Sequence, residues 1–159
     1  MSKEILQRIQ CELVAPKGQT NKFGGYKYRS AEDILEAVKP LLKKYNAALT
    51  IHDEIIEVGG AARVYVRAIA SLFDASSGAL VANSAALARE AMMKKGMDEA
   101  QITGSASSYA RKYALNGLFA IDDTKDADAT NTHGKEISKT TSKPKSKAVQ
   151  KTDAFDDMM

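Results

Sequence analysis

Two neighbouring cations, Arg111 and Lys112, follow a run of glycine, alanine and serine in the segment from Gly104 to Leu115. Arginine offers a planar fork and lysine a mobile point charge, and both groups bind phosphate oxygens. Small side chains let a second backbone or a phosphate approach closely. The segment is therefore a candidate phosphate-binding surface. The same pattern is also typical of a helix packed tightly on a sheet, with solvated cations at its edge.

Aromatic residues alternate with cations in two further segments, one from Lys22 to Arg29 and one from Arg63 to Arg67. Unstacked bases stack on aromatic rings while cations follow the phosphates, which is the combination that a single-strand binder needs. A loop folded onto the core, or a solvated sheet face, would give the same patterns. The candidate DNA-binding residues are Lys22, Lys27, Tyr28, Arg29, Arg63, Tyr65, Arg67, Arg111 and Lys112, with Tyr28 and Tyr65 as the stacking candidates.

The sequence predicts no enzyme active site. It lacks a serine or cysteine nucleophile motif, a phosphate-binding loop and a set of histidines and cysteines at metal-ligand spacing. The acidic cluster from Asp122 to Asp128 could chelate a divalent cation and support a nuclease. A solubilising start to a polar tail explains this cluster better, so we predict no catalytic residue, no metal and no cofactor.

Composition is typical of a globular protein, with 44% hydrophobic and 27% charged residues. The net charge of +3 is too small by itself to indicate a nucleic-acid binder. Apolar runs are too short to span a membrane, and the N-terminus does not resemble an export signal. The single cysteine, Cys11, fits a reducing compartment and is expected to be buried. We therefore expect a cytoplasmic protein.

Helices are predicted where apolar residues recur every three or four positions. Pro40 is expected to kink or break the second of them. In the third helix, capped by Asp98, we expect Tyr109 and Tyr113 to face the core, so that Arg111 and Lys112 point away from it. The predicted helices cover residues 2–14, 30–45 and 98–119.

Strict alternation of apolar and polar residues predicts antiparallel strands over residues 47–58, 61–73 and 79–87, although the alanines of the third also fit a helix. The glycine-containing stretch 17–29 predicts a small hairpin. The fold class is therefore α+β, a three-stranded antiparallel sheet backed by helices. Residues 1–123 are expected to form one compact domain. Residues 124–159 are expected to form a disordered, lysine-rich tail with an acidic tip.

The segment Gly104-Ser-Ala-Ser-Ser-Tyr-Ala-Arg-Lys-Tyr-Ala-Leu115, followed by Ile121-Asp-Asp123, resembles the signature of the Erf family of phage single-strand annealing proteins. That signature runs Gly-Ser-x-x-Thr-Tyr-x-Arg-Arg-Tyr-x-Leu and then an acidic patch. Ser108 and Lys112 replace the threonine and the second arginine, which keeps the hydroxyl and the charge. The resemblance also includes Tyr26-Lys-Tyr-Arg-Ser30 and covers about residues 17–128.

The resemblance implies a protein that binds single-stranded DNA and anneals complementary strands in phage homologous recombination, as a ring or filament in the cytoplasm of the bacterial host. It also implies an annealing-protein-like fold, a hairpin-rich sheet backed by a helix, and it assigns DNA binding, annealing and oligomerisation to residues 1–123. The expected partners are single-stranded DNA, the annealed duplex, further copies of the chain, and a host single-strand binding protein or a phage exonuclease. A passive coating protein that never anneals DNA is the alternative, and a metal-dependent nuclease is a third reading.

Overall fold

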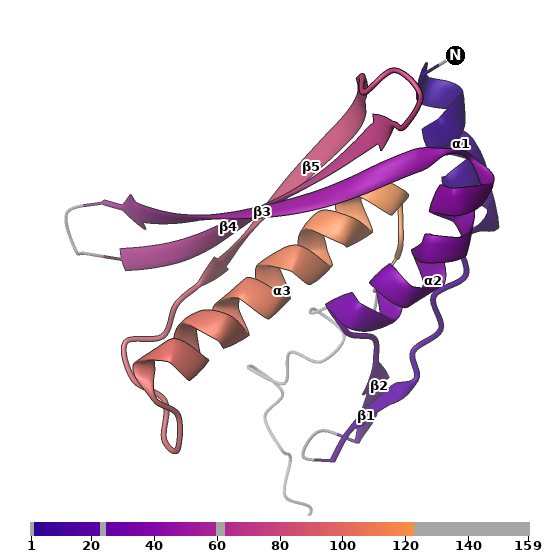
Figure 1. The fold of residues 1–159 in the computed structure, drawn as a ribbon. Coiled ribbons are helices and arrows are strands. Elements are labelled where there is room, and N and C mark those ends of the chain that lie inside the picture. The colour runs from indigo at the N-terminus through magenta and orange to yellow at the C-terminus, as the bar shows by residue number, and fades with distance from the viewer. Residues whose placement is uncertain (1, 23–24, 60–62, 123–159) are drawn as a thin grey trace, which may run out of the picture. The chain divides into compact units, whose positions relative to one another are not determined.

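The computed structural model describes residues 2–22, 25–59 and 63–122. The described residues form an α+β fold with a three-stranded antiparallel sheet, which confirms the predicted class. The tail predicted for residues 124–159 lies outside them. The elements follow in the order α1 (Ser2–Glu12), β1 (Gln19–Asn21), β2 (Tyr26–Tyr28), α2 (Ala31–Lys44), β3 (Ala47–Val58), β4 (Arg63–Asp74), β5 (Leu80–Arg89) and α3 (Glu99–Phe119) (Figure 1).

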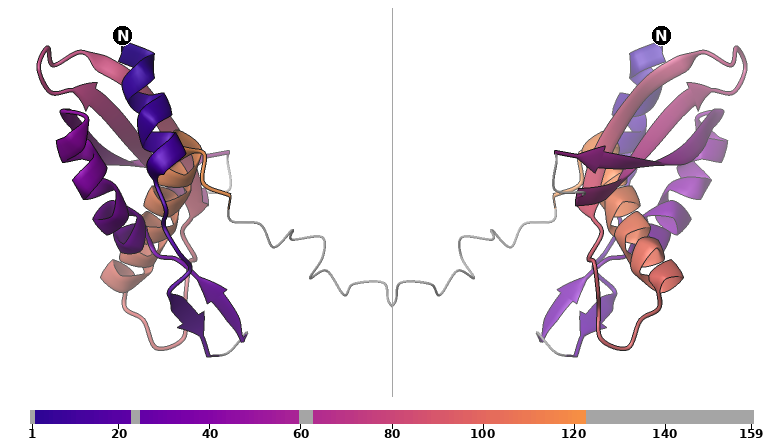
Figure 2. Two further views of the ribbon diagram at one scale, coloured as in Figure 1. Left: turned by 90° about the vertical axis from the view of Figure 1, so that its right-hand side faces the viewer. Right: turned by 90° about the vertical axis from the view of Figure 1, so that its left-hand side faces the viewer.

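The main sheet has the strand order β3-β4-β5, with both strand pairs antiparallel. Alternate residues of β4 are buried, namely Val66, Ala68, Ala70 and Leu72, because one face of the strand points into the core. The alanine-rich segment is confirmed as a strand and extends to Arg89. Helix α3 lies along one face of this sheet, and no helix of the described chain covers the opposite face (Figures 1 and 2).

Alanines form the contact between α3 and the sheet. Ala106, Ala110 and Ala114 recur every fourth residue and are buried in the core, because positions four apart lie on one side of a helix. The strands beneath them also present alanines to the core, at Ala68 and Ala70 of β4 and Ala82, Ala86 and Ala88 of β5. Since neither surface carries large side chains here, α3 approaches the sheet closely.

The prediction that Tyr109 and Tyr113 face the core is wrong, because the alanine row occupies that side of α3. Each tyrosine precedes an alanine of the row by one residue, which rotates it by about 100° around the helix axis. Both tyrosines are consequently exposed to solvent. The predicted burial of Cys11 is also wrong. Helix α1 buries Ile9, and Cys11 lies almost on the opposite side of that helix.

Local signals set the helix ends as predicted. Ser30 and Asp33 form a capping box at the start of α2, and Asp98 accepts a hydrogen bond from the Gln101 amide at the start of α3. Helix α2 continues through Pro40, so the predicted break does not occur. Ile34 and Val38 before the proline are buried, and Leu41 and Leu42 after it pack against the same core. This packing holds the helix together across the lost hydrogen bond.

Candidate nucleic-acid interface

Two stacked tyrosines form the most exposed aromatic surface of α3. The rings of Tyr109 and Tyr113 have centroids 6.3 Å apart and planes 28° apart. Their exposed fractions are 54% and 47%. The Lys112 ammonium lies 5.4 Å from the centroid of the Tyr113 ring, within the range of a cation–π contact. The i, i+4 spacing places the rings in one column on the helix, so they present flat π faces beside a positive charge.

This tyrosine pair forms one wall of a groove between α3 and the end of β5. The groove has a volume of about 350 Å³ and is also lined by Arg89 and Lys94. Tyr109 in addition lines a second hollow of about 210 Å³, which reaches Tyr28 of β2. Tyr109 belongs to both hollows, so aromatic rings and cations border this tyrosine on both sides. We call this surface the tyrosine strip; its residues are Tyr28, Arg89, Lys94, Tyr109, Lys112 and Tyr113.

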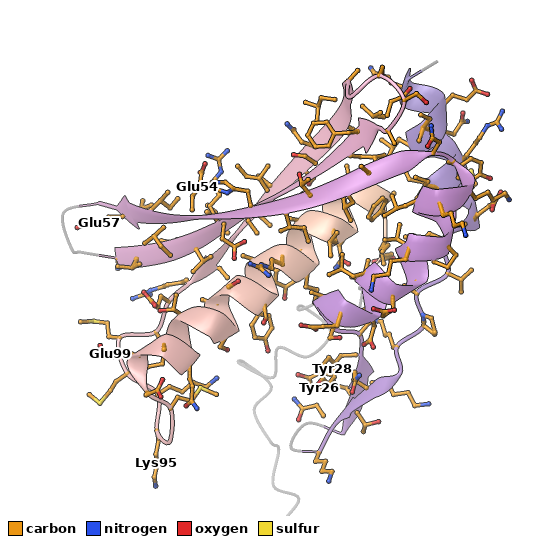
Figure 3. All side chains as sticks on the ribbon, in the orientation of Figure 1. Tyr26, Tyr28, Glu54, Glu57, Lys95 and Glu99 are labelled. Atoms are coloured by element: carbon orange, nitrogen blue, oxygen red, sulfur yellow. The ribbon has the colours of Figure 1, made fainter. Side chains whose placement is uncertain are left out.

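The β1–β2 hairpin extends the tyrosine strip beyond Tyr28. Tyr26 and Tyr28 meet edge to face, with ring centroids 6.3 Å apart, below α2 in Figure 3. The Asn21 side chain donates a hydrogen bond of 2.9 Å to the Tyr26 hydroxyl across the hairpin. Lys22 and Lys27 are both exposed on this hairpin. The structure therefore brings one of the predicted residues, Tyr28, to the same hollow as Lys112 of α3. Lys27 lies on the other face of β2, because neighbouring residues of a strand point to opposite faces.

Arg63, Tyr65 and Arg67 lie on the other face of the sheet, away from α3. Arg67 lies opposite Glu54 of β3, and its Nη1 is 3.3 Å from the Glu54 Oε2. Tyr65 is half-buried and lies opposite Arg89 of β5. Glu54 is seen on this face in Figure 3. The predicted residues thus occupy two surfaces rather than one. Arg89 pairs with Tyr65, so its side chain starts on the Tyr65 face, although the residue also lines the groove at the end of β5.

Arg29, unlike the predicted residues on these two surfaces, is buried. Its Nη2 donates a hydrogen bond of 3.3 Å to the carbonyl oxygen of Asp122. This contact joins β2 to the residues that follow α3. In the described chain, Arg29 therefore fixes the position of the hairpin that carries Tyr28.

Arg111 is paired with Asp53 of β3. The guanidinium Nε lies 2.9 Å and 3.1 Å from the two carboxylate oxygens, and Nη2 lies 2.8 Å from Oδ2. The Ser107 hydroxyl donates a further hydrogen bond of 2.6 Å to Asp53. Burial raises the pKa of Asp53, but the hydrogen bonds from Arg111 and Ser107 outweigh it and hold that pKa below its usual value. The pair therefore joins α3 to β3 through an ionised carboxylate.

Four residues of the tyrosine strip were not predicted as contacts: Arg89, Lys94, Tyr109 and Tyr113. The sequence carried a signal for the tyrosines, because two tyrosines four residues apart beside a lysine form a column on any helix. The prediction interpreted this spacing as a buried face of the helix, and so it placed both tyrosines in the core. Arg89 and Lys94 are five residues apart around a strand end, and their common groove depends on how α3 docks on β5.

Two kinds of feature are absent from the described residues, a cluster of metal ligands and a membrane-spanning helix. Residues 2–22, 25–59 and 63–122 contain no group of three or more potential metal ligands. The remainder of the acidic cluster, from Asp123 to Asp128, lies outside these residues. None of the three helices described is long and apolar enough to cross a membrane.

Comparison with known proteins identifies the family. A family model described as the ERF superfamily matches residues 3–154. The chain belongs to the ERF superfamily. It is also 57% identical over 131 residues to the Essential recombination function protein of Salmonella phage P22. No solved structure matches it.

The alignment with this ERF-superfamily relative covers 80% of the present chain and 60% of the phage P22 protein. The chain thus spans less than two thirds of the length of its relative. Membership of the ERF superfamily confirms the resemblance that the segment from Gly104 to Leu115 predicted.

Proposed function

We propose that this protein binds single-stranded DNA and anneals complementary strands in phage recombination, acting as an oligomer in the cytoplasm of the bacterial host. The observation that carries the proposal is the exposed Tyr109–Tyr113 pair with Lys112 beside it and the α3–β5 groove in front of it. The name of the phage P22 relative supports the recombination role. The proposal needs no catalytic residue, metal or cofactor.

The tyrosine strip combines the two interactions that a single strand offers. Base–aromatic stacking contributes about 1–3 kcal/mol per base and works with every base. Lys94 and Lys112 would neutralise phosphates along the same path. A strand held mainly through base faces and phosphates keeps its pairing edges available to a second strand. Several copies of the chain on one strand would multiply these contacts through effective concentration.

The other predicted residues have supporting places in the proposal. Lys22 and Lys27 would add positive charge to the β1–β2 hairpin, beside the tyrosines of β2. Arg63, Tyr65 and Arg67 form a second cationic surface on the opposite sheet face, where a duplex or a DNA segment bound by a neighbouring copy could lie. Arg29 and Arg111 position the strip, because each is engaged with another part of the chain. A host single-strand binding protein or a phage exonuclease is a further partner of the proposed recombination role.

The test compares Tyr109→Ala with Tyr109→Phe in binding to a fluorescently labelled single strand. Loss of the ring should weaken binding by about 5- to 150-fold, the equivalent of one base stack. Tyr109→Phe keeps the ring and should bind like the wild type. Lys112→Ala should make the slope of log K against log salt shallower by about 0.7, the value for one lost phosphate contact. Lys39→Ala on α2 is the matched lysine control, because Lys39 is exposed and pairs with Glu36.

Folded Tyr109→Ala and Lys112→Ala variants that bind like the wild type would refute the tyrosine strip as the DNA site. Annealing is tested separately, by mixing complementary oligonucleotides with the wild-type protein. Faster duplex formation supports the annealing role. Coating of both strands without acceleration would instead identify a passive coating protein.

A further inference from the structure

The connector between β5 and α3 presents two methionines to solvent. The exposed fractions of Met92 and Met93 are 94% and 88%, the highest among the large hydrophobic side chains of the described residues. Exposed apolar side chains lose the free energy that burial would provide, and clusters of them mark interaction sites. These two are adjacent in the chain and are followed directly by Lys94 and Lys95.

Hydrogen bonds fix the connector at both ends. The Glu90 amide donates to the Val64 carbonyl of β4 at 2.9 Å, and the Asp98 carboxylate accepts from the Gln101 amide of α3 at 2.8 Å. The Met97 amide donates to the Lys94 carbonyl at 3.1 Å, and Gly96 takes a φ of 80° in that turn. The methionines therefore project from a loop that has a defined conformation, with its ends held by the sheet and by α3.

Two adjacent lysines at the tip of this loop can attract the phosphates of a nucleic acid. Lys94 and Lys95 are exposed, and Figure 3 shows Lys95 extending away from α3 at the tip of the loop. The two flanking acids are engaged with α3, because Glu90 accepts a hydrogen bond from the Thr103 hydroxyl and Asp98 caps the helix. Lys94 also lines the α3–β5 groove together with the two tyrosines of that groove. Ala91, which also lines the groove, and Lys94 directly flank the two methionines in the chain, so the methionines belong to the segment at the edge of the groove.

We propose that Met92 and Met93 insert among the bases of the single strand that lies along the tyrosine strip, and so hold those bases unstacked. This inference rests on the proposed function. Methionine side chains act as wedges between bases in other nucleic-acid complexes. The side chain is unbranched and polarizable, so it adapts to any base and imposes no sequence preference. Unstacked bases are free to test pairing with a second strand.

The test compares Met92→Ser/Met93→Ser with the wild type on single strands that contain 2-aminopurine, whose fluorescence rises when its neighbours unstack. The wild type should raise this fluorescence on binding. The double variant should lose most of the rise even at saturating protein, and its affinity should fall by about 3- to 100-fold. Val14→Ser is the matched control, because Val14 is also highly exposed but lies in the α1–β1 connector.

Three results would overturn the inference or its basis. If the double variant keeps the full fluorescence rise at saturation, the methionines do not unstack the bases. That result refutes the inference but leaves the proposed DNA binding intact. A double variant that changes its sedimentation coefficient in the absence of DNA shows instead that the methionines contact another copy of the chain. A wild-type protein with no affinity for single strands refutes the proposed function itself, and the inference with it.

Discussion

Removing the Asp53–Arg111 ion pair should destabilise the fold, by an amount that the geometry constrains. Hydrogen bonds to charged groups contribute about 1.5–3 kcal/mol when well shielded. The Asp53 side chain is 20% exposed, whereas the Arg111 side chain is 46% exposed, so solvent screens part of this attraction. We therefore expect a coupling energy of about 1–2 kcal/mol between the two side chains.

The two single variants should differ in cost. Arg111→Ala leaves the Asp53 carboxylate mostly shielded, with Ser107 as its remaining hydrogen-bond donor among the contacts described above. That loss should cost about 2–3 kcal/mol, because a charge kept from water is poorly compensated. Asp53→Ala leaves a half-exposed guanidinium that water can solvate, so its cost should be about 1–2 kcal/mol. Arg111→Lys keeps the charge but loses the planar fork, and should fall between wild type and Arg111→Ala.

Urea unfolding of the wild type, both single variants and the double variant measures the coupling energy. The exposed Glu36–Lys39 pair of α2 is the control cycle, and its coupling should stay below about 0.5 kcal/mol. An Asp53–Arg111 coupling as small as that of the control would refute the structural role of the pair. So would an Arg111→Ala variant of normal stability that loses DNA affinity with a shallower salt slope, because that result makes Arg111 a phosphate contact.

Two further predictions concern α3 and pH. A Cβ at Gly117 would lie 2.5 Å from the Ser84 Oγ, so Gly117→Ala should lower stability despite alanine's higher helix propensity, and adding Ser84→Ala should restore it. Gly104→Ala meets nothing within 4 Å and should instead raise stability by about 0.5–1 kcal/mol in the same urea assay. Because the folded pKa of Asp53 lies below its ordinary value, its contribution is complete above the unfolded pKa and disappears as pH falls through the folded pKa. Asp53→Asn should therefore lose less stability than the wild type between about pH 6 and about pH 3.

The elements with strong local signals were predictable from the sequence. Strict alternation predicted the strand β4 with Val66 and Leu72 on one face, and the capping residues Ser30 and Asp98 located the starts of α2 and α3. These signals depend on neighbours within a few residues, so they do not require knowledge of the tertiary fold.

The orientation of α3 was not predictable in the same way. Assigning the largest apolar side chains to the core placed Tyr109 and Tyr113 inside, whereas the core side is the alanine row that includes Ala110. The alanines of β4 and β5 explain this orientation, because their small side chains let the alanine row of α3 pack closely against the sheet. The Asp53–Arg111 pair joins positions 58 residues apart, and its formation depends on how α3 docks on β3. Sequence spacing alone contains neither fact.

The adjacent cations of α3 face different environments, and this difference favours one of them as the phosphate contact. A phosphate that bound Arg111 in place of Asp53 would leave a shielded carboxylate without its cation, at a cost of about 2–3 kcal/mol. That cost would offset most of the gain from one new charged hydrogen bond. Lys112 lies about 100° further around the helix, with its ammonium over the Tyr113 ring. An ammonium has three donor hydrogens, so Lys112 can keep the ring contact while it binds a phosphate oxygen. A single strand should therefore follow Lys112 and the tyrosines, while Arg111 holds the helix that presents them.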